Sequence, residues 1–213
     1  MSLSRWQPAR TAVFSMDCQN DICHERGKFT GPIAGQLRAS TVLSRIAACL
    51  DAARAAGVLV VHVRHIREPG IDDAPDEDNR MFRGMRRSEA LVSGTWGAAV
   101  MDEVAPVTGD LIVDKHRVSA FAGTELDRML RQRGIDSLVL AGVTTTFVVE
   151  GTARDAVDRG YRTAVVSDGC VSLSDDAHRL SLEHVLPYLA TVTDSDIVTD
   201  WLRANALAQR PPY

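Results

Sequence analysis

Short apolar runs alternate with longer amphipathic stretches along the chain. Runs of strand length occupy residues 11–16, 58–63, 111–113, 137–141, 163–167 and 190–193. Stretches with apolar residues at helical spacing cover residues 36–56, 124–134, 145–160, 175–184 and 194–207. Buried strands that alternate with helices are typical of a parallel sheet covered on both faces. We therefore predict a three-layer α/β/α sandwich with a mainly parallel six-stranded sheet.

One long segment does not fit this alternation. Residues 64–96 are charged and rich in turn formers, with no clear apolar stripe. A loop of this length inside a compact domain is usually functional, so we interpret it as a lid or an interface. We find no internal repeat or linker, and 213 residues with 45% hydrophobic content suffice for a sizeable core. The sequence thus predicts a single domain over residues 1–213.

Composition narrows the classes of partner. The net charge is −4 and the pI about 5.8, so no basic face for nucleic acid or an anionic membrane is expected. No apolar run approaches the ~20 residues of a membrane span, and Arg5 and Arg10 interrupt the start of the chain where a signal peptide would be apolar. The four cysteines have irregular spacing, which favours reduced thiols. We expect a cytoplasmic protein with a small-molecule substrate.

Polar residues gather where the predicted strands end. Asp17 follows the first strand and Lys115 follows the third. Ligands bind at this edge of open α/β sheets, so the two side chains can meet in one cleft, where Asp17 moves a proton and Lys115 stabilises an anion. A turn-forming aspartate and a solvated lysine are the simpler alternatives. Other polar residues near this edge are Thr144, Thr145, Thr146, Asp168, His65 and His116.

Three sequence blocks together resemble the isochorismatase-like superfamily of hydrolases, which includes cysteine amidases. They are Asp17-Cys18-Gln19-Asn20-Asp21, then Asp114-Lys115-His116, then Gly142-Val143-Thr144-Thr145 with Thr152-Ala153-Arg154-Asp155-Ala156. The resemblance runs from about residue 11 to residue 198 and matches Asp17 and Lys115 to the catalytic acid and lysine. It also implies a cis peptide at Val143–Thr144. The backbone N–H groups of Thr144 and Val148 are implied as an oxyanion hole.

The chain departs from the family amidases at one position. Where they carry the nucleophilic cysteine, this chain has Val148, which offers no nucleophile. A relocated cysteine is the alternative, and the four candidates are Cys18, Cys23, Cys49 and Cys170. We expect Cys18 to point away from Asp17, and Cys49 to lie in the core. We therefore interpret the chain as a branch that lacks the usual thiol.

Metal and cofactors are not expected. The nicotinamidase branch binds zinc through Asp-x-His, whereas this chain reads His62-Val63-Arg64-His65. A site built from His65 with Asp72 or Asp73 has unspecific spacing. We therefore predict a site without metal or cofactor.

The isochorismatase branch also lacks the cysteine and, by resemblance, hydrolyses a vinyl ether with its aspartate as general acid. We predict such a cysteine-independent hydrolase for a small polar metabolite. True isochorismatases resemble Gly-Val-Tyr-Ala-His at the strand-to-helix turn, whereas this chain reads Gly-Val-Thr-Thr-Thr there. This difference argues against isochorismate itself as the substrate. The alternatives are a noncatalytic binder of the same fold and a structural or interaction partner. Five arginines of the 64–96 segment could bind an anionic substrate, although we prefer a solvated, salt-bridged lid: Arg64, Arg67, Arg83, Arg86 and Arg87. The resemblance also implies a homodimer or homotetramer.

Overall fold

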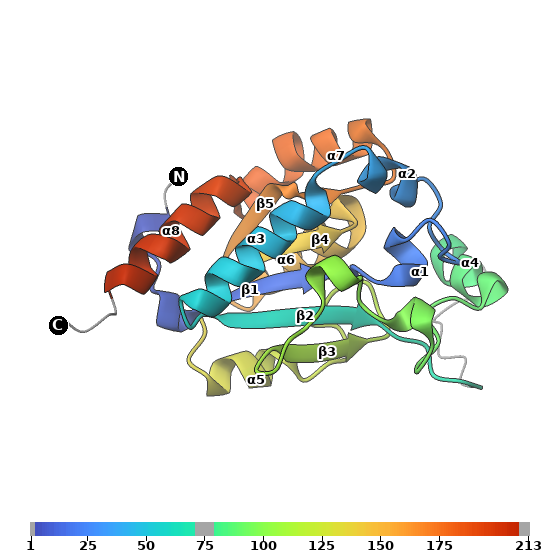
Figure 1. The fold of residues 1–213 in the computed structure, drawn as a ribbon, viewed down its shortest axis with the longest axis horizontal. Helices are drawn as coiled ribbons and strands as arrows, with labels where there is room; N and C mark the ends of the chain where they lie inside the picture. Colours follow the sequence, from blue (N-terminus) through green and yellow to red (C-terminus); the bar gives the residue numbers. More distant parts are fainter. Residues whose placement is uncertain (1–2, 71–78, 209–213) are drawn as a thin grey trace.

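The six strands form one parallel sheet. In the computed structural model, which describes residues 3–70 and 79–208, the strand order is β3-β2-β1-β4-β5-β6. The strands are β1 (Thr11–Met16), β2 (Leu59–His65), β3 (Leu111–Lys115), β4 (Ser137–Val143), β5 (Arg162–Val171) and β6 (Thr191–Thr193). All of the pairings are parallel, which confirms the predicted three-layer sandwich (Figure 1).

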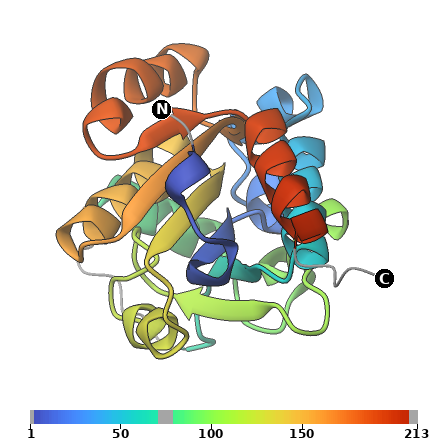
Figure 2. The ribbon, with the colours of Figure 1, turned by 90° about the vertical axis from the view of Figure 1, so that its left-hand side faces the viewer.

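Helices cover both faces of this sheet. The helices are α1 (Asn20–Cys23), α2 (Ile33–Arg38), α3 (Val42–Ala55), α4 (Arg80–Ser88), α5 (Leu126–Gln132), α6 (Glu150–Asp158), α7 (Asp175–Leu180) and α8 (Ser195–Ala208). Helices α3 and α8 lie side by side over one face, as the views in Figures 1 and 2 both show. Their core joins alternate strand residues such as Val13, Val60 and Val139. Phe14 and Leu140 point to the other face, where α5 and α6 cover them.

Several predicted boundaries were wrong. The single helix predicted for residues 36–56 is two helices, α2 and α3, separated by a turn around Ser40. The segment predicted as a loop, 64–96, contains α4, whose Asn79 side chain caps it by accepting from the N–H groups of Met81 and Phe82. Strand β5 continues to Val171 rather than ending at residue 167. The side chain of Ser174 caps α7 by accepting from the N–H of Ala177.

Strands β1 and β4 approach closely where Gly142 pairs with Met16. Gly142, near the end of β4, has a φ of 142°, and a Cβ there would lie 2.3 Å from the carbonyl oxygen of Met16. Only glycine fits so close to a neighbouring backbone. The pairing of β4 with β5 also shifts between Leu140 and Gly142, which redirects the chain at the carboxyl edge of the sheet.

In the described part of the chain, no helix is long and apolar enough to cross a membrane.

Candidate active site

Asp17 occupies the first turn beyond β1. Its φ of 53° is unusual for a residue with a side chain, and its N–H donates to the carbonyl oxygen of Val63 at 2.9 Å. The residue is 3% exposed. The central strand therefore delivers this carboxylate into the interior at the carboxyl edge of the sheet.

Lys115, the last residue of β3, forms a buried ion pair with Asp17. Its Nζ lies 2.8 Å from Asp17 Oδ2 and 3.0 Å from the carbonyl oxygen of Arg117, and the residue is 1% exposed. Burial raises the pKa of the Asp17 carboxyl, and the lysine opposes only part of that rise. Asp17 Oδ1 is buried and has no hydrogen-bond partner among the described residues. One carboxylate oxygen is thus anchored, and the other is buried with no partner among the described residues.

The strand-to-helix turn after β4 has the cis peptide that the resemblance implied. The Val143–Thr144 bond is cis, and a π-helical turn at Thr145–Val149 follows it and leads into α6. Thr145 Oγ1 lies 2.8 Å from His178 Nδ1, and Thr146 Oγ1 lies 2.7 Å from Ser172 Oγ. These two hydroxyls brace the turn against α7 and the end of β5.

Val148 lies in this turn and is 7% exposed. Its N–H donates to the carbonyl oxygen of Thr144 at 3.1 Å, so this donor is already paired in the structure. A role for the Val148 N–H in an oxyanion hole therefore requires that it share or exchange this bond, and the role stays a prediction.

Asp17, Lys115, Thr144 and Val148 all line one cavity. Its volume is about 930 Å³, and it lies between the carboxyl edge of the sheet and the segments around Phe29 and α4. The wall is largely apolar, with contributions from these side chains: Ile22, Phe29, Ile33, Met81, Met85, Leu91, Val118, Phe147 and Leu173. A mostly apolar cavity with a few converging polar groups is the usual form of a small-molecule site.

His65 also lines this cavity. It ends β2 and pairs in register with Lys115, and burial together with the lysine charge lowers the pKa of its imidazole to about 3. The ring is therefore neutral near pH 7 and packs 6.1 Å from the Phe82 ring. Sequence reasoning placed His65 near the site but gave it no role beyond a metal ligand.

The residues that follow Asp17 are structural, which the sequence did not reveal. The Gln19 side chain donates to the carbonyl oxygens of His65 and Ala98 and accepts from the N–H of His65 at 2.7 Å. Asp21 accepts from the N–H of Lys28 at 2.9 Å and of Leu91 at 2.7 Å. Their burial among long-range partners tethers the segments that roof the cavity.

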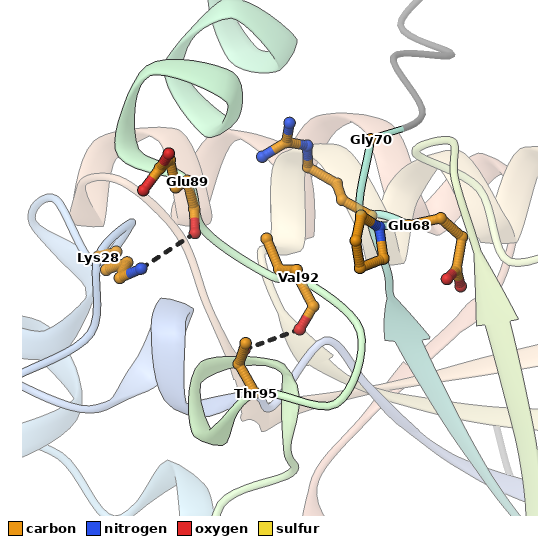
Figure 3. Close-up of a pocket in the computed structure, with 8 residues that line it drawn as sticks. Lys28, Glu68, Gly70, Glu89, Val92 and Thr95 are labelled. Atoms are coloured by element: carbon orange, nitrogen blue, oxygen red, sulfur yellow. Dashed lines mark hydrogen bonds between the residues drawn. The ribbon is translucent and has the colours of Figure 1, made fainter.

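A second, more open cavity of about 540 Å³ lies next to the first. Figure 3 shows Lys28 reaching toward the backbone carbonyl of Glu89, away from the Glu68 carboxylate, and the Nζ–O distance is 3.3 Å. Lys28 lines both cavities, but Asp17 and Lys115 line only the first. The larger cavity is therefore the candidate active site.

Other predicted candidates lie elsewhere. The Asp168 carboxylate accepts from the N–H and hydroxyl of Ser195, at 2.7 and 2.6 Å, and so holds the start of α8. His116 Nδ1 is 2.7 Å from the carbonyl oxygen of Ile66. Arg64 forms a bidentate pair with Asp114, with both N–O distances 2.7 Å, which agrees with a salt-bridged surface at this position.

The cysteines form no part of the cavity wall. Cys18, Cys23, Cys49 and Cys170 are all free and buried, and none lines the larger cavity. Burial raises the pKa of Cys49 and of Cys170 to about 12, and a hydrogen bond with Cys18 together with burial raises the pKa of Cys23. Thiols of this kind are poor nucleophiles because the thiolate is the reactive form.

The described residues contain no group of three or more His, Cys, Asp or Glu side chains that could hold a metal ion. Asp72 and Asp73, the partners considered for His65, lie outside the described residues. The expectation of a metal-free site therefore stays a prediction.

Known proteins share this fold and much of this sequence. The Isochorismatase domain family matches residues 11–197. The chain belongs to the isochorismatase family of hydrolases. A ureidoacrylate amidohydrolase RutB from Rhizobium rhizogenes is 34% identical over 206 residues, which cover 88% of this chain and 82% of that protein. Its counterpart from Agrobacterium fabrum is 33% identical and covers 88% and 89%.

Solved structures of related proteins have the same fold as this isochorismatase-family hydrolase. A cysteine hydrolase from Pseudomonas syringae superposes with a TM-score of 0.83 at 29% identity, covering 94% of this chain and 97% of that one. N-carbamoylsarcosine amidase from Thermoplasma acidophilum superposes with a TM-score of 0.71 at 31% identity, covering 88% and 97%. The resemblance on which the site assignment drew is thereby confirmed at the level of the family.

Proposed function

We propose that this isochorismatase-family hydrolase cleaves a vinyl–heteroatom bond in a small anionic metabolite, with Asp17 as general acid and no thiol nucleophile. The observation that carries the proposal is the state of the Asp17 carboxyl. Lys115 anchors its Oδ2, its Oδ1 has no partner among the described residues, and burial raises its pKa. A buried carboxyl of this kind can carry a proton at a pH where an exposed one cannot.

The reaction follows from placing a vinyl ether or N-vinyl urea against Asp17. The carboxyl gives its proton to the vinyl carbon distant from the heteroatom, and the carbon bonded to the heteroatom becomes a cation stabilised by the heteroatom lone pair. Water adds to that carbon and returns a proton to Asp17. The adduct then collapses to a carbonyl compound and the free alcohol or urea, so the net change is the addition of one water.

The walls of the cavity favour a substrate that carries a carboxylate. Lys28 and Arg80 line the cavity and are exposed, and Lys115 is buried beside Asp17, whereas Asp17 is the one acidic side chain among the described residues that line this cavity. An excess of cationic groups attracts anions and orients them within the site. The name of the RutB relatives points the same way, since ureidoacrylate is an anion whose urea nitrogen bears a vinyl carbon.

Amide hydrolysis through a thioester is the chemistry that the site does not support. Val148 has no nucleophile, and none of the cysteines lines the cavity. Retention of the Lys115–Asp17 pair at 2.8 Å also distinguishes this chain from a binder that has lost its proton-transfer group.

The test uses one compound with two possible cleavage sites. Purified enzyme is incubated with ureidoacrylate and with a panel of vinyl ethers, amides, ureas and imides, and the products are identified by mass spectrometry. Vinyl cleavage of ureidoacrylate yields urea and malonic semialdehyde, whereas cleavage at the ureido carbonyl releases carbamate or ammonia. Urea, or the ketone or aldehyde from a vinyl ether, supports the proposal. Ammonia without urea, abolished by iodoacetamide, would show that a relocated cysteine acts.

A further inference from the structure

The larger cavity has more room than the smallest substrates of the proposed reaction fill. Its volume of about 930 Å³ lies near the upper end of the roughly 300–1,000 Å³ that is usual for small-molecule sites. Even if each of its non-hydrogen atoms took the ~30 Å³ of a water molecule in the liquid, ureidoacrylate would occupy roughly 270 Å³. A compound of that size leaves more than half of the cavity to water.

Large apolar side chains of the cavity wall are accessible to a ligand. Phe147 and Leu173 both line the cavity, and they are 43% and 45% exposed. Further apolar side chains in the wall are half-buried and so retain accessible surface: Ile22, Phe29, Met81 and Val118. Apolar surface that is covered when a ligand binds contributes favourably to the binding free energy. This wall therefore favours a ligand with apolar surface of its own.

The accessible apolar side chains come from separate parts of the chain. Phe29 lies between α1 and α2, Met81 is in α4, Phe147 is in the turn before α6, and Leu173 follows β5. They converge on the cavity that also contains the Lys115–Asp17 pair. Exposed apolar groups gathered on a surface mark either an interface or a ligand site, and their position around one concave space favours a small molecule.

From these observations we infer that the substrate carries an apolar chain or ring, comparable to a hexyl or phenyl group, beside the bond that is cleaved. The inference rests on the proposed function and specifies its class of substrate. The vinyl–heteroatom bond lies toward Asp17, and the apolar group packs against Phe29, Phe147 and Leu173. Met81 adds a flexible thioether, which adapts to groups of different shape.

Binding of straight-chain carboxylates, from butyrate to octanoate, tests the inference without turnover. Carboxylates are suitable probes because the exposed cations Lys28 and Arg80 also line the cavity. In isothermal titration calorimetry we expect Kd to fall about fourfold with each added methylene, because each one covers more apolar surface. A Kd that stays the same from butyrate to octanoate would overturn the inference.

Two leucine variants show whether the chain binds in this cavity. Leu173→Ser removes an exposed leucine from the wall, whereas Leu180→Ser removes one that is 59% exposed at the end of α7 and does not line the cavity. We expect Leu173→Ser to weaken octanoate binding about five- to tenfold and to change butyrate binding by less than about twofold. Leu180→Ser should change neither. An equal loss of octanoate affinity in the two variants would contradict the assignment.

Alkyl vinyl ethers test the same preference in the reaction. We expect kcat/KM to rise from the ethyl to the hexyl ether in the wild type, and to rise less steeply in Leu173→Ser. If octanoate binds as expected but no vinyl compound is cleaved, the proposed reaction fails and the apolar ligand site stands. If Leu173→Ser lowers the mass measured by light scattering but leaves octanoate affinity unchanged, this face is an interface between copies of the chain and the inference is wrong.

Discussion

Removing the charge of Lys115 should destabilise the protein in a way that depends on pH. In Lys115→Met the side chain keeps a similar length but no longer contacts Asp17 Oδ2 at 2.8 Å. Asp17 then lies buried without its counter-ion, and the folded protein avoids this by keeping the carboxyl protonated. Protonating a carboxyl of ordinary pKa, about 3.9, at pH 7 costs at most about 4 kcal/mol.

That ceiling sets the magnitude of the effect. Part of this cost is already present in the wild type, because burial raises the pKa of Asp17 even beside the lysine. We therefore expect a loss of up to about 4 kcal/mol at pH 7, or a fall in Tm of up to roughly 8–16 °C for a domain of this size. At pH 5 the same ceiling is only about 1.5 kcal/mol, because a free carboxyl is closer to its own pKa.

The direction follows from proton linkage. The pKa of Asp17 is higher in the folded state than in the unfolded state, so the folded state binds more protons between those two values. Stability from this group is therefore greatest below the unfolded pKa and declines as the pH rises through the folded pKa. In Lys115→Met the folded pKa rises further, and the decline extends to higher pH.

Urea unfolding of the wild type and of Lys115→Met at pH 5 and pH 7 measures the loss of unfolding free energy at each pH. The control is the double variant Asp17→Asn with Lys115→Met, which has neither charge and whose stability relative to wild type should change less between the two pH values than that of Lys115→Met. A deficit in Lys115→Met that is equal at both pH values, or larger at pH 5, would refute the assignment of the cost to Asp17 protonation.

Three further outcomes are expected. In Val148→Cys, the new thiol lies in the first turn of a helix beside the cavity, so its pKa should be lowered and iodoacetamide should modify it faster than the four native cysteines in peptide mapping. Gly97→Ala places a Cβ about 2.0 Å from the Asp21 carboxylate, so urea unfolding should show a loss of about 1–3 kcal/mol, whereas Gly35→Ala, which meets nothing within 4 Å, should not be destabilised. We also predict a homodimer or homotetramer, and a monomeric mass by light scattering at micromolar concentration would contradict it.

The sequence by itself was sufficient for the arrangement of layers. Apolar runs of strand length, separated by helical stripes, identified the six strands, because strands buried on both faces must be apolar throughout. The same pattern placed Asp17 and Lys115 at strand ends, and parallel strands bring their carboxyl ends to one edge. The presence of valine at position 148 is also a property of the sequence alone.

Local patterns were less informative where long-range contacts decide the structure. Helix α4 was not predicted, because its basic sequence has little apolar signal, and only Phe82 and Met85 are buried in it. Gln19 and Asp21 carry no local sign of their partners, which lie 46 to 79 residues away for Gln19 and up to 70 for Asp21. Local propensity depends on residues that are close in the sequence, whereas these long-range hydrogen bonds form only when the chain has folded.

The chemistry of the site was decided by the tertiary structure. A sequence can nominate Asp17 and Lys115, but only folding removes them from water, joins them at 2.8 Å and raises the pKa of the carboxyl. Folding also brings Thr144, from the turn after β4, into the same cavity wall as Asp17 and Lys115. Burial and interatomic distance set the pKa of a side chain such as Asp17 and decide whether it has a hydrogen-bond partner. Both are properties of the folded chain and of no single stretch of sequence.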